Sequence, residues 1–181
     1  IKYDNIPFDI SFFDDIQNYH VGLVIVSKET FKHTKTRNML YESHVPVLKM
    51  ANKSFSSVKD AALILSDNRD LEKISTTIYD ISEQMGFNID LYDYQNEHEA
   101  YKEQVIEHYY NLSTIFSKNI KVLKENENPI KILSQKDDFI HILPFTFKLT
   151  KKRLYSLFST DSEKLYFKLD DYHQIFIPVQ L

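Results

Sequence analysis

Apolar residues gather in short uninterrupted runs rather than alternating with polar ones. The runs are "HVGLVIVS" (20–27), "SHVPVLKM" (43–50), "DAALILSDN" (60–68), "FIHILPF" (139–145) and "HQIFIPVQL" (173–181). Runs of four to eight residues that are rich in β-branched or aromatic side chains are typical of strands buried on both faces of a sheet. The pattern therefore predicts a mainly parallel sheet that is covered on both sides.

Longer segments between these runs follow a helical period. In 70–86 apolar residues recur every three or four positions, and Gly86 is placed to end the helix. A second stripe, with Tyr109 near its centre, runs through 98–118. The segment between them, 87–94, alternates and is predicted to be a strand. Strands that alternate with helices indicate an α/β fold with an open, mainly parallel, five-stranded sheet and helices on both faces.

A short basic phrase occurs twice, as "TFKHTKTR" (30–37) and "TFKLTKKR" (146–153), with two differences in eight positions. Each copy follows an apolar run and precedes a strand that contains Pro-Val. Ahead of each run we expect a strand and a short polar helix; these four segments are 7–13, 14–19, 120–125 and 128–138. Such self-similarity indicates duplication of one unit, although chance matching of a Lys/Thr-rich octamer is the alternative.

The repeat suggests how the chain is divided. We predict a partial α/β unit at 1–50, which is the closing half of a first copy, and a complete unit at 53–181. The second copy has about 20 extra residues before its last strand, and we expect 164–169 and 174–179 to pair as a hairpin there. We also expect a partner strand to cover the free edge of "GLVIVS", because the unpaired main-chain groups of an open edge can pair with other chains and cause aggregation.

The complete unit resembles a universal stress protein domain. The features that match are "ALILSD" with Asp67 at its end, the order of helices and strands that follows, and the final "IPV"; the first segment resembles the second half of the same domain, through "GLVIVS" and "VPVLKM". The resemblance implies a degenerate tandem with an open five-stranded sheet. It also implies that Asp67, at the end of the strand "ALILSD", is placed to meet an adenine or ribose edge.

The sequence departs from the nucleotide-binding members of that family. The chain has only two glycines, and neither 27–43 nor 146–171 contains one. Without glycine a loop cannot easily bring main-chain N–H groups close to phosphates. We therefore expect either a non-binding member with no cofactor or a member whose ligand has changed.

The two basic phrases are the candidate ligand site. In an open α/β sheet they follow the carboxyl ends of strands, where ligands bind. Lysine and arginine side chains there suit a nucleotide or another anion. The candidate residues are Lys28, Lys32, Lys35 and Arg37 in the first copy and Lys148, Lys151, Lys152 and Arg153 in the second. The alternative, which we favour, is a solvated basic helix start that serves solubility or subunit contact.

Composition excludes several classes of function. The net charge of −4 argues against nucleic acid, the absence of cysteine excludes disulfides and thiolate chemistry, and no apolar run is long enough to span a bilayer. No nucleophile motif or carboxylate pair indicates catalysis. His98 and His108 are ten residues apart, which does not suit a metal site on a helix. The first residue is Ile1, which suggests a piece of a longer polypeptide; a complete small protein freed of a tag is the alternative.

A second resemblance concerns the end of the chain. The stretches "NPIKIL", "ILPF" and "LYFKLDDYHQIFIPV" are similar to the cytosolic C-terminal part of bacterial TrkA-type potassium channel proteins. This implies a non-catalytic, cytoplasmic, ligand-sensing module that regulates potassium or other cation transport, attached to a membrane-embedded transport domain. We expect it to form a homodimer. The alternative is a self-standing universal stress protein that binds an adenine nucleotide, with slow ATP hydrolysis left open.

Overall fold

The computed structural model describes residues 9, 11–55, 58–65, 70–94, 99–125, 128–145 and 161–179. Seven strands form one sheet, with bounds β1 (Val24–Ser27), β2 (Val47–Met50), β3 (Asp60–Leu65), β4 (Asn88–Tyr94), β5 (Ile120–Glu125), β6 (Phe139–Phe145) and β7 (Gln174–Pro178). The helices are α1 (Phe12–Asn18), α2 (Lys28–Lys32), α3 (Thr34–Glu42), α4 (Asp70–Lys73), α5 (Ser75–Met85), α6 (Glu99–Ile115), α7 (Pro129–Leu133) and α8 (Asp161–Lys168).

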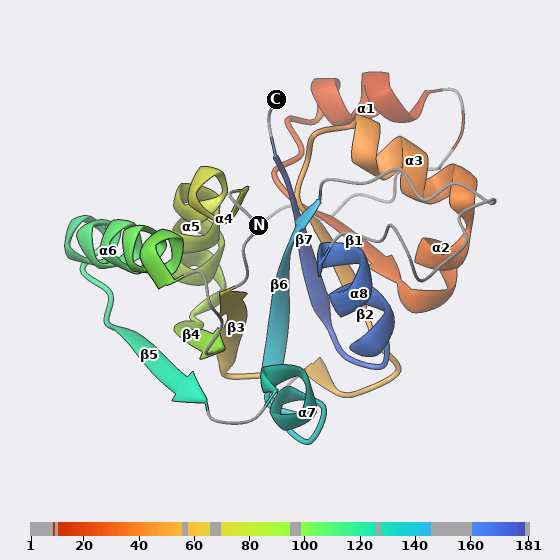
Figure 1. Cartoon of the computed structure of the whole chain (residues 1–181). Coiled ribbons are helices and arrows are strands. Elements are labelled where there is room, and N and C mark those ends of the chain that lie inside the picture. The colour runs from red at the N-terminus through yellow and green to blue at the C-terminus, as the bar shows by residue number, and fades with distance from the viewer. Residues whose placement is uncertain are drawn as a thin grey trace.

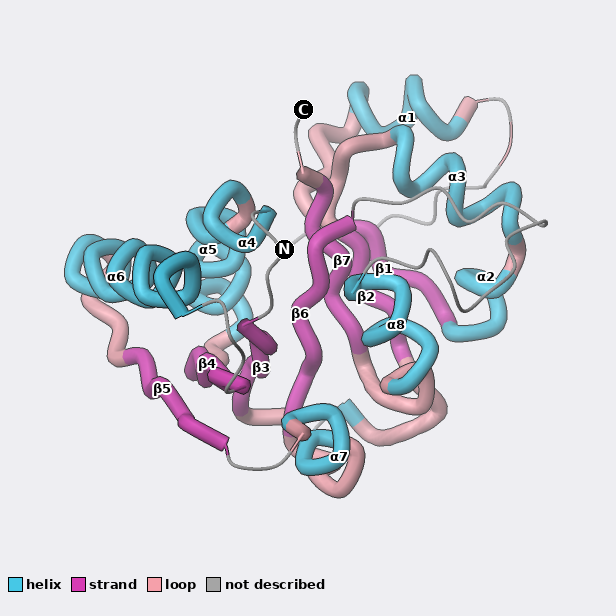
Figure 2. The backbone as a smooth tube through the Cα atoms, viewed as in Figure 1, coloured by secondary structure: helices cyan, strands magenta, loops and turns pink. Residues whose placement is uncertain are grey.

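The strand order across the sheet is β1-β2-β7-β6-β3-β4-β5. All neighbouring strands are parallel except β2 and β7, which are antiparallel with Leu48 opposite Ile175. The sheet thus has two parallel parts of opposite direction that meet at the β2–β7 pair (Figures 1 and 2). The predicted α/β class and mainly parallel sheet are confirmed; the sheet has seven strands rather than five because β1 and β2 join it.

Helices cover both faces of the sheet, and each face has its own apolar core. On one face α4, α5 and α6 pack against the sheet through residues such as Leu71, Ile78 and Tyr109. On the other face lie α1, α2, α3, α7 and α8, with Phe31 and Phe176 among the buried residues. The uninterrupted apolar runs of the sequence are explained by this arrangement, since a strand between two helical layers needs apolar side chains on both sides.

Local signals fixed several boundaries. Gly86 ends α5 with a left-handed backbone (φ 74°), as the helical stripe predicted. Pro129 opens α7 behind Asn128, whose side chain accepts a hydrogen bond from the Ile130 N–H. The segment 70–86 is divided at Ile74 into α4 and α5.

Two predicted strands are wrong. Residues 164–169, expected to pair with 174–179 as a hairpin, instead form the last part of α8 and its end. Leu165, Tyr166 and Leu169 are buried there while Phe167 is half exposed, which is the spacing of a helical face. Likewise, Phe12 and Phe13 lie in α1 and not in a strand; Pro7, Phe8 and Ile10 lie outside the described residues.

A similar succession of elements leads to β2 and to β7. In the described residues, a helix, a strand, two helices and a strand (α1-β1-α2-α3-β2) correspond to a helix, a strand, one helix and a strand (α7-β6-α8-β7). The division into 1–50 and 53–181, and the duplication, stay predictions. Strand β1 lies at the sheet edge with the Ile25 side chain 51% exposed. A partner strand at that edge also stays a prediction. No helix within the described ranges is long and apolar enough to cross a bilayer.

Candidate ligand-binding cleft

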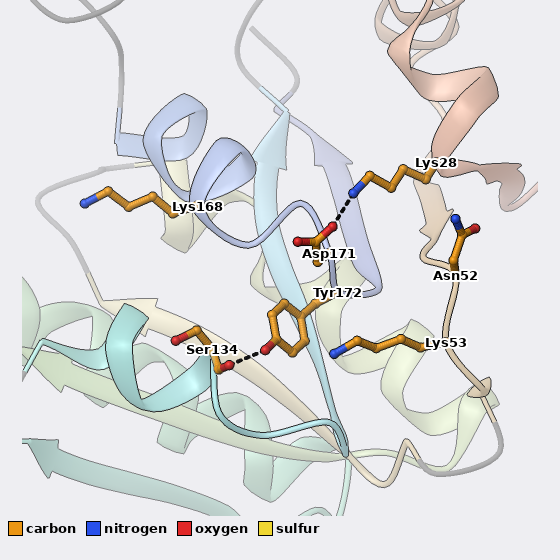
Figure 3. A pocket seen from close by; sticks show the side chains of 7 residues that line it. All are labelled: Lys28, Asn52, Lys53, Ser134, Lys168, Asp171 and Tyr172. Atoms are coloured by element: carbon orange, nitrogen blue, oxygen red, sulfur yellow. Dashed lines mark hydrogen bonds and ion pairs between the residues drawn. The ribbon is translucent and has the colours of Figure 1, made fainter.

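A cleft of about 540 Å³ opens where the two parts of the sheet meet. It is lined by Lys28, Asn52, Lys53, Ser134, Lys168, Asp171 and Tyr172 (Figure 3). Because β2 and β7 are antiparallel, these residues follow the carboxyl ends of β1 and β2 but precede the amino ends of β6 and β7. Four segments that are distant in the sequence therefore bring three lysine side chains to one place.

Lys28 begins α2 directly after β1 and forms ion pairs with two successive carboxylates. Its Nζ contacts Asp171 closely and lies 3.0 Å from Asp170 Oδ2. The hydrogen bond with Asp171 raises the pKa of Lys28, and the same bond lowers the pKa of Asp171. The Lys28 side chain is only 12% exposed, whereas that of Asp171 is 83% exposed.

Lys49 lies beneath this pair and is fully buried. Its Nζ donates to the carbonyl oxygen of Asp170 and to Asp170 Oδ1, both at 2.7 Å. Burial lowers the pKa of Lys49 to about 8, although the bonds to Asp170 oppose this. Burial raises the pKa of Asp170, but the hydrogen bonds from Lys49 and Lys28 lower it more, so the pKa of Asp170 lies below its usual value.

The pKa of Lys49 makes stability depend on pH in a defined direction. Between about pH 8 and the ordinary lysine value of 10.5, Lys49 is neutral in the folded protein but protonated in the unfolded chain. The unfolded state then binds more protons, so raising the pH stabilises the fold, by up to roughly 1.4 kcal/mol per pH unit. Urea unfolding at pH 7.5, 8.5 and 9.5 should show this rise in wild type and its loss in Lys49→Met. Equal slopes in the two proteins would contradict it.

Behind the cleft, Lys49 is the first of three buried polar residues in register on neighbouring strands. Gln174 of β7 lies opposite Lys49 of β2, and His141 of β6 lies opposite Gln174. All three are at most 1% exposed. Burial lowers the pKa of His141 to about 3, so its ring is neutral. Neither ring nitrogen of His141 has a hydrogen-bond partner within the described part of the chain.

Tyr172 separates this buried row from the cleft. Its ring lies 5.3 Å from the His141 ring, and its hydroxyl donates to the carbonyl oxygen of Ser134. The Nζ of Lys53 is 3.9 Å from the centre of the Tyr172 ring and pairs with Asp137, a bond that raises the pKa of Lys53. Tyr172 is thereby held between α7 and the segment after β2, as Figure 3 shows.

Of the candidate residues around the first basic phrase, Lys28, two positions before the phrase, lines the cleft. Lys32 pairs with Glu29 at 3.2 Å on the surface, and Lys35 is exposed on α3. Arg37 points back to the end of α2, where its Nη1 donates to the carbonyl oxygens of Phe31 (3.0 Å) and Lys32 (2.6 Å). Arg37 therefore satisfies helix-terminal carbonyl groups and stabilises the local fold.

The other predicted site residues, Asp67, Lys148, Lys151, Lys152 and Arg153, lie outside the described residues. The strand ends that precede the two phrases are nevertheless described. Ser27 at the end of β1 pairs with Met50 of β2, next to the residue that faces the amino end of β7, whereas Phe145 pairs with Pro178 at the carboxyl end of β7. The two strands that precede the phrases therefore end at opposite edges of the sheet, one at the amino end of β7 and the other at its carboxyl end.

Of the seven residues that line the cleft, sequence reasoning found only Lys28 and missed the other six, namely Asn52, Lys53, Ser134, Lys168, Asp171 and Tyr172. The adjacent pair Asp170 and Asp171 was visible, but such pairs are common in turns. Only the antiparallel β2–β7 pair brings this turn to Lys28, and nothing in the sequence predicted it. Within the described ranges, no cluster of three or more His, Asp or Glu side chains is arranged to bind a metal.

Comparison with solved structures identifies the fold. A universal stress protein from Archaeoglobus fulgidus DSM 4304 matches with a TM-score of 0.56 and 11% identity over 94% of this chain and 64% of that one. A protein of unknown function from Pseudomonas aeruginosa PAO1 matches with a TM-score of 0.52 and 12% identity, over 93% and 67% of the two chains. The cytoplasmic domain of a prokaryotic cation chloride cotransporter reaches 0.49 with 10% identity, over 91% and 67%.

The chain spans about two thirds of the length of these neighbours. At these identities the similarity shows the fold alone, which is like that of universal stress proteins. The sequence matches no model of a known family and no curated protein.

Proposed function

We propose that this chain is a non-catalytic regulatory module that senses a small anionic ligand in the cleft at the β2–β7 junction. The observation that carries the proposal is that Lys28, Lys53 and Lys168 all line one cleft of about 540 Å³, a volume suited to a small molecule. Asn52 and Tyr172 add polar and aromatic surface beside the lysines. Side-chain ammonium groups bind anions without the glycine-rich turn that this chain lacks.

The finer identity of the ligand is part of the proposal. A nucleotide fits the combination of cationic groups and an aromatic ring, and it is the ligand class that the resemblance to universal stress proteins implies. In this cleft its phosphates would meet lysine side chains rather than main-chain N–H groups.

We propose, further, that the module belongs to a larger cytoplasmic assembly that regulates potassium or other cation transport, and that it acts as a homodimer. The support is the sequence similarity of "ILPF" and "LYFKLDDYHQIFIPV" to the end of TrkA-type proteins. A parent polypeptide with membrane-spanning segments would support this setting. A parent without them would overturn the transport role and leave the sensing role.

Thermal shift with a panel of anions tests the sensing role. We expect phosphate, pyrophosphate, tripolyphosphate, AMP, ADP, ATP, NAD and cyclic dinucleotides to include at least one that raises Tm saturably. At 100 times Kd the stabilisation is about 2.7 kcal/mol, which corresponds to roughly 5–10 °C. Tripolyphosphate alongside ATP shows whether the base contributes.

Matched variants locate the binding. The double variant Lys53→Ala, Lys168→Ala should reduce the shift strongly, because both side chains line the cleft. Lys35→Ala removes an exposed lysine of α3 that does not line it, and should keep the shift. Absence of a shift with every anion, or an equal shift in the double variant, would overturn the proposal.

A further inference from the structure

The cleft already contains an anion of the chain itself. Lys28 and Asp171 both line it and form an ion pair, and Figure 3 shows the Asp171 carboxylate directed at the Lys28 amino group. A ligand that is to contact Lys28 from the cleft must therefore compete with Asp171. This inference rests on the proposed function, and it concerns how binding at the same cleft is controlled and which anions bind there.

The two carboxylates of the turn have different roles. Asp170 has a side chain 25% exposed and accepts from Lys49 through both its side chain and its main chain. Asp171 has a side chain 83% exposed, and its ion pair is with Lys28. Moving Asp170 would leave the ammonium of Lys49 buried without its carboxylate, which is costly. Moving Asp171 frees a carboxylate that is already exposed to water, and Lys28 keeps its second ion pair with Asp170.

We propose that Asp171 is a built-in competitor that occupies Lys28 in the free protein and is displaced by a phosphoryl group of the ligand. Asp170 stays on Lys49 and keeps its own contact with Lys28. A singly charged carboxylate would replace Asp171 with no gain in charge. A phosphoryl group carries more negative charge, close to two at neutral pH, and has three acceptor oxygens. Lys168 on another wall of the cleft, together with Lys53, which also pairs with Asp137, compensates the additional charge.

The displacement makes the site selective by charge. Monoanions such as acetate or chloride carry no more negative charge than the Asp171 carboxylate that they would have to displace, so they bind poorly. The ligand class that follows is a phosphate ester or polyphosphate with at least one terminal, doubly charged phosphoryl group. Binding also releases Asp171 from Lys28, and this changes the contact between the α8–β7 turn and the start of α2.

Isothermal titration with inorganic pyrophosphate tests the competitor. Asp171→Asn removes the charge but keeps the size, and we expect roughly two- to five-fold tighter binding than in wild type, the range of an exposed ion pair. Asp171→Glu keeps a carboxylate and should stay near wild type. Glu29→Gln removes an exposed carboxylate of α2 that does not line the cleft, and controls for the change in net charge.

The outcomes separate this inference from the proposed function. Binding of pyrophosphate to wild type with equal or weaker binding to Asp171→Asn would overturn the competitor and leave the anion site. The same gain in Glu29→Gln as in Asp171→Asn would also overturn it, since net charge would then explain the effect. If pyrophosphate and the anion panel bind to neither protein, the proposed function fails first, and the competitor fails with it.

Discussion

Replacement of Phe31 by Ala is expected to destabilise the protein by about 3–5 kcal/mol, the usual cost of removing a buried phenylalanine. Phe31 is fully buried, and its ring stacks on Phe176 with centroids 4.7 Å apart. It also contacts Tyr166 and Phe145, which belong to α8 and β6. Removal of the ring leaves a cavity bounded by strands and helices that cannot close it. Urea or thermal unfolding measures the loss, roughly 6–20 °C in Tm for a chain of this size.

Phe167→Ala is the matched control. It removes the same side chain from α8, where Phe167 is 50% exposed, and should cost much less. A loss in Phe31→Ala no larger than in Phe167→Ala would show that Phe31 does not anchor the first basic phrase. The contrast matters because Phe31 lies inside "TFKHTKTR", whose positive charges suggest binding.

In this phrase, charge alone does not show which side chains reach the cleft and which serve the fold. Its lysines and arginine were considered as a ligand site, yet Phe31 and Arg37 connect α2 to the core and to α3. Lysine and arginine side chains are long, and the atoms they contact depend on neighbouring elements that the sequence does not specify. Among the candidate cations that the structure describes, only Lys28 at the start of α2, two positions before the phrase, lines the cleft. Lys32 and Lys35 do not line the cleft, and the alternative of a solvated basic helix start stays a prediction for them.

The sheet was predictable because its signal is local. A strand between two helical layers shows its burial directly, as in 139–145, where every residue of β6 is buried. Gly86 likewise needs no partner to end α5. The helix α8 was missed because "KLYFKL" is short and alternates almost as a strand does. Runs of this length do not distinguish a helix from a strand.

The cleft was not predictable for a topological reason. Lys28 and Lys53 follow the adjacent parallel strands β1 and β2, and Lys168 joins them at the cleft only because β2 and β7 are antiparallel. The expected hairpin placed residues 164–169 in a strand, so Asp171 and Tyr172 could not be assigned to the start of β7 beside Lys28. The buried row of Lys49, Gln174 and His141 depends on the same register.

The second large effect is expected at Asp170. Asp170→Ala removes the carboxylate that pairs with the buried ammonium of Lys49, at 2.7 Å, and should destabilise the protein by about 3 kcal/mol at pH 7. The cost arises because Lys49 is fully buried and must either stay charged without this carboxylate or lose its proton. Urea unfolding measures the loss. It should shrink by pH 9.5, where Lys49 is already neutral in the folded wild-type protein.

Lys49→Met should cost much less, within about 1 kcal/mol, because an apolar side chain of similar length suits the buried position and Asp170 keeps Lys28 and partial exposure to water. The double variant should be close to Lys49→Met alone, since no ammonium is then left without its carboxylate. Equal losses for the two single variants at pH 7 would mean that the pair stabilises the fold as a pair. In that case the buried ammonium left without its carboxylate would not be the main cost of Asp170→Ala.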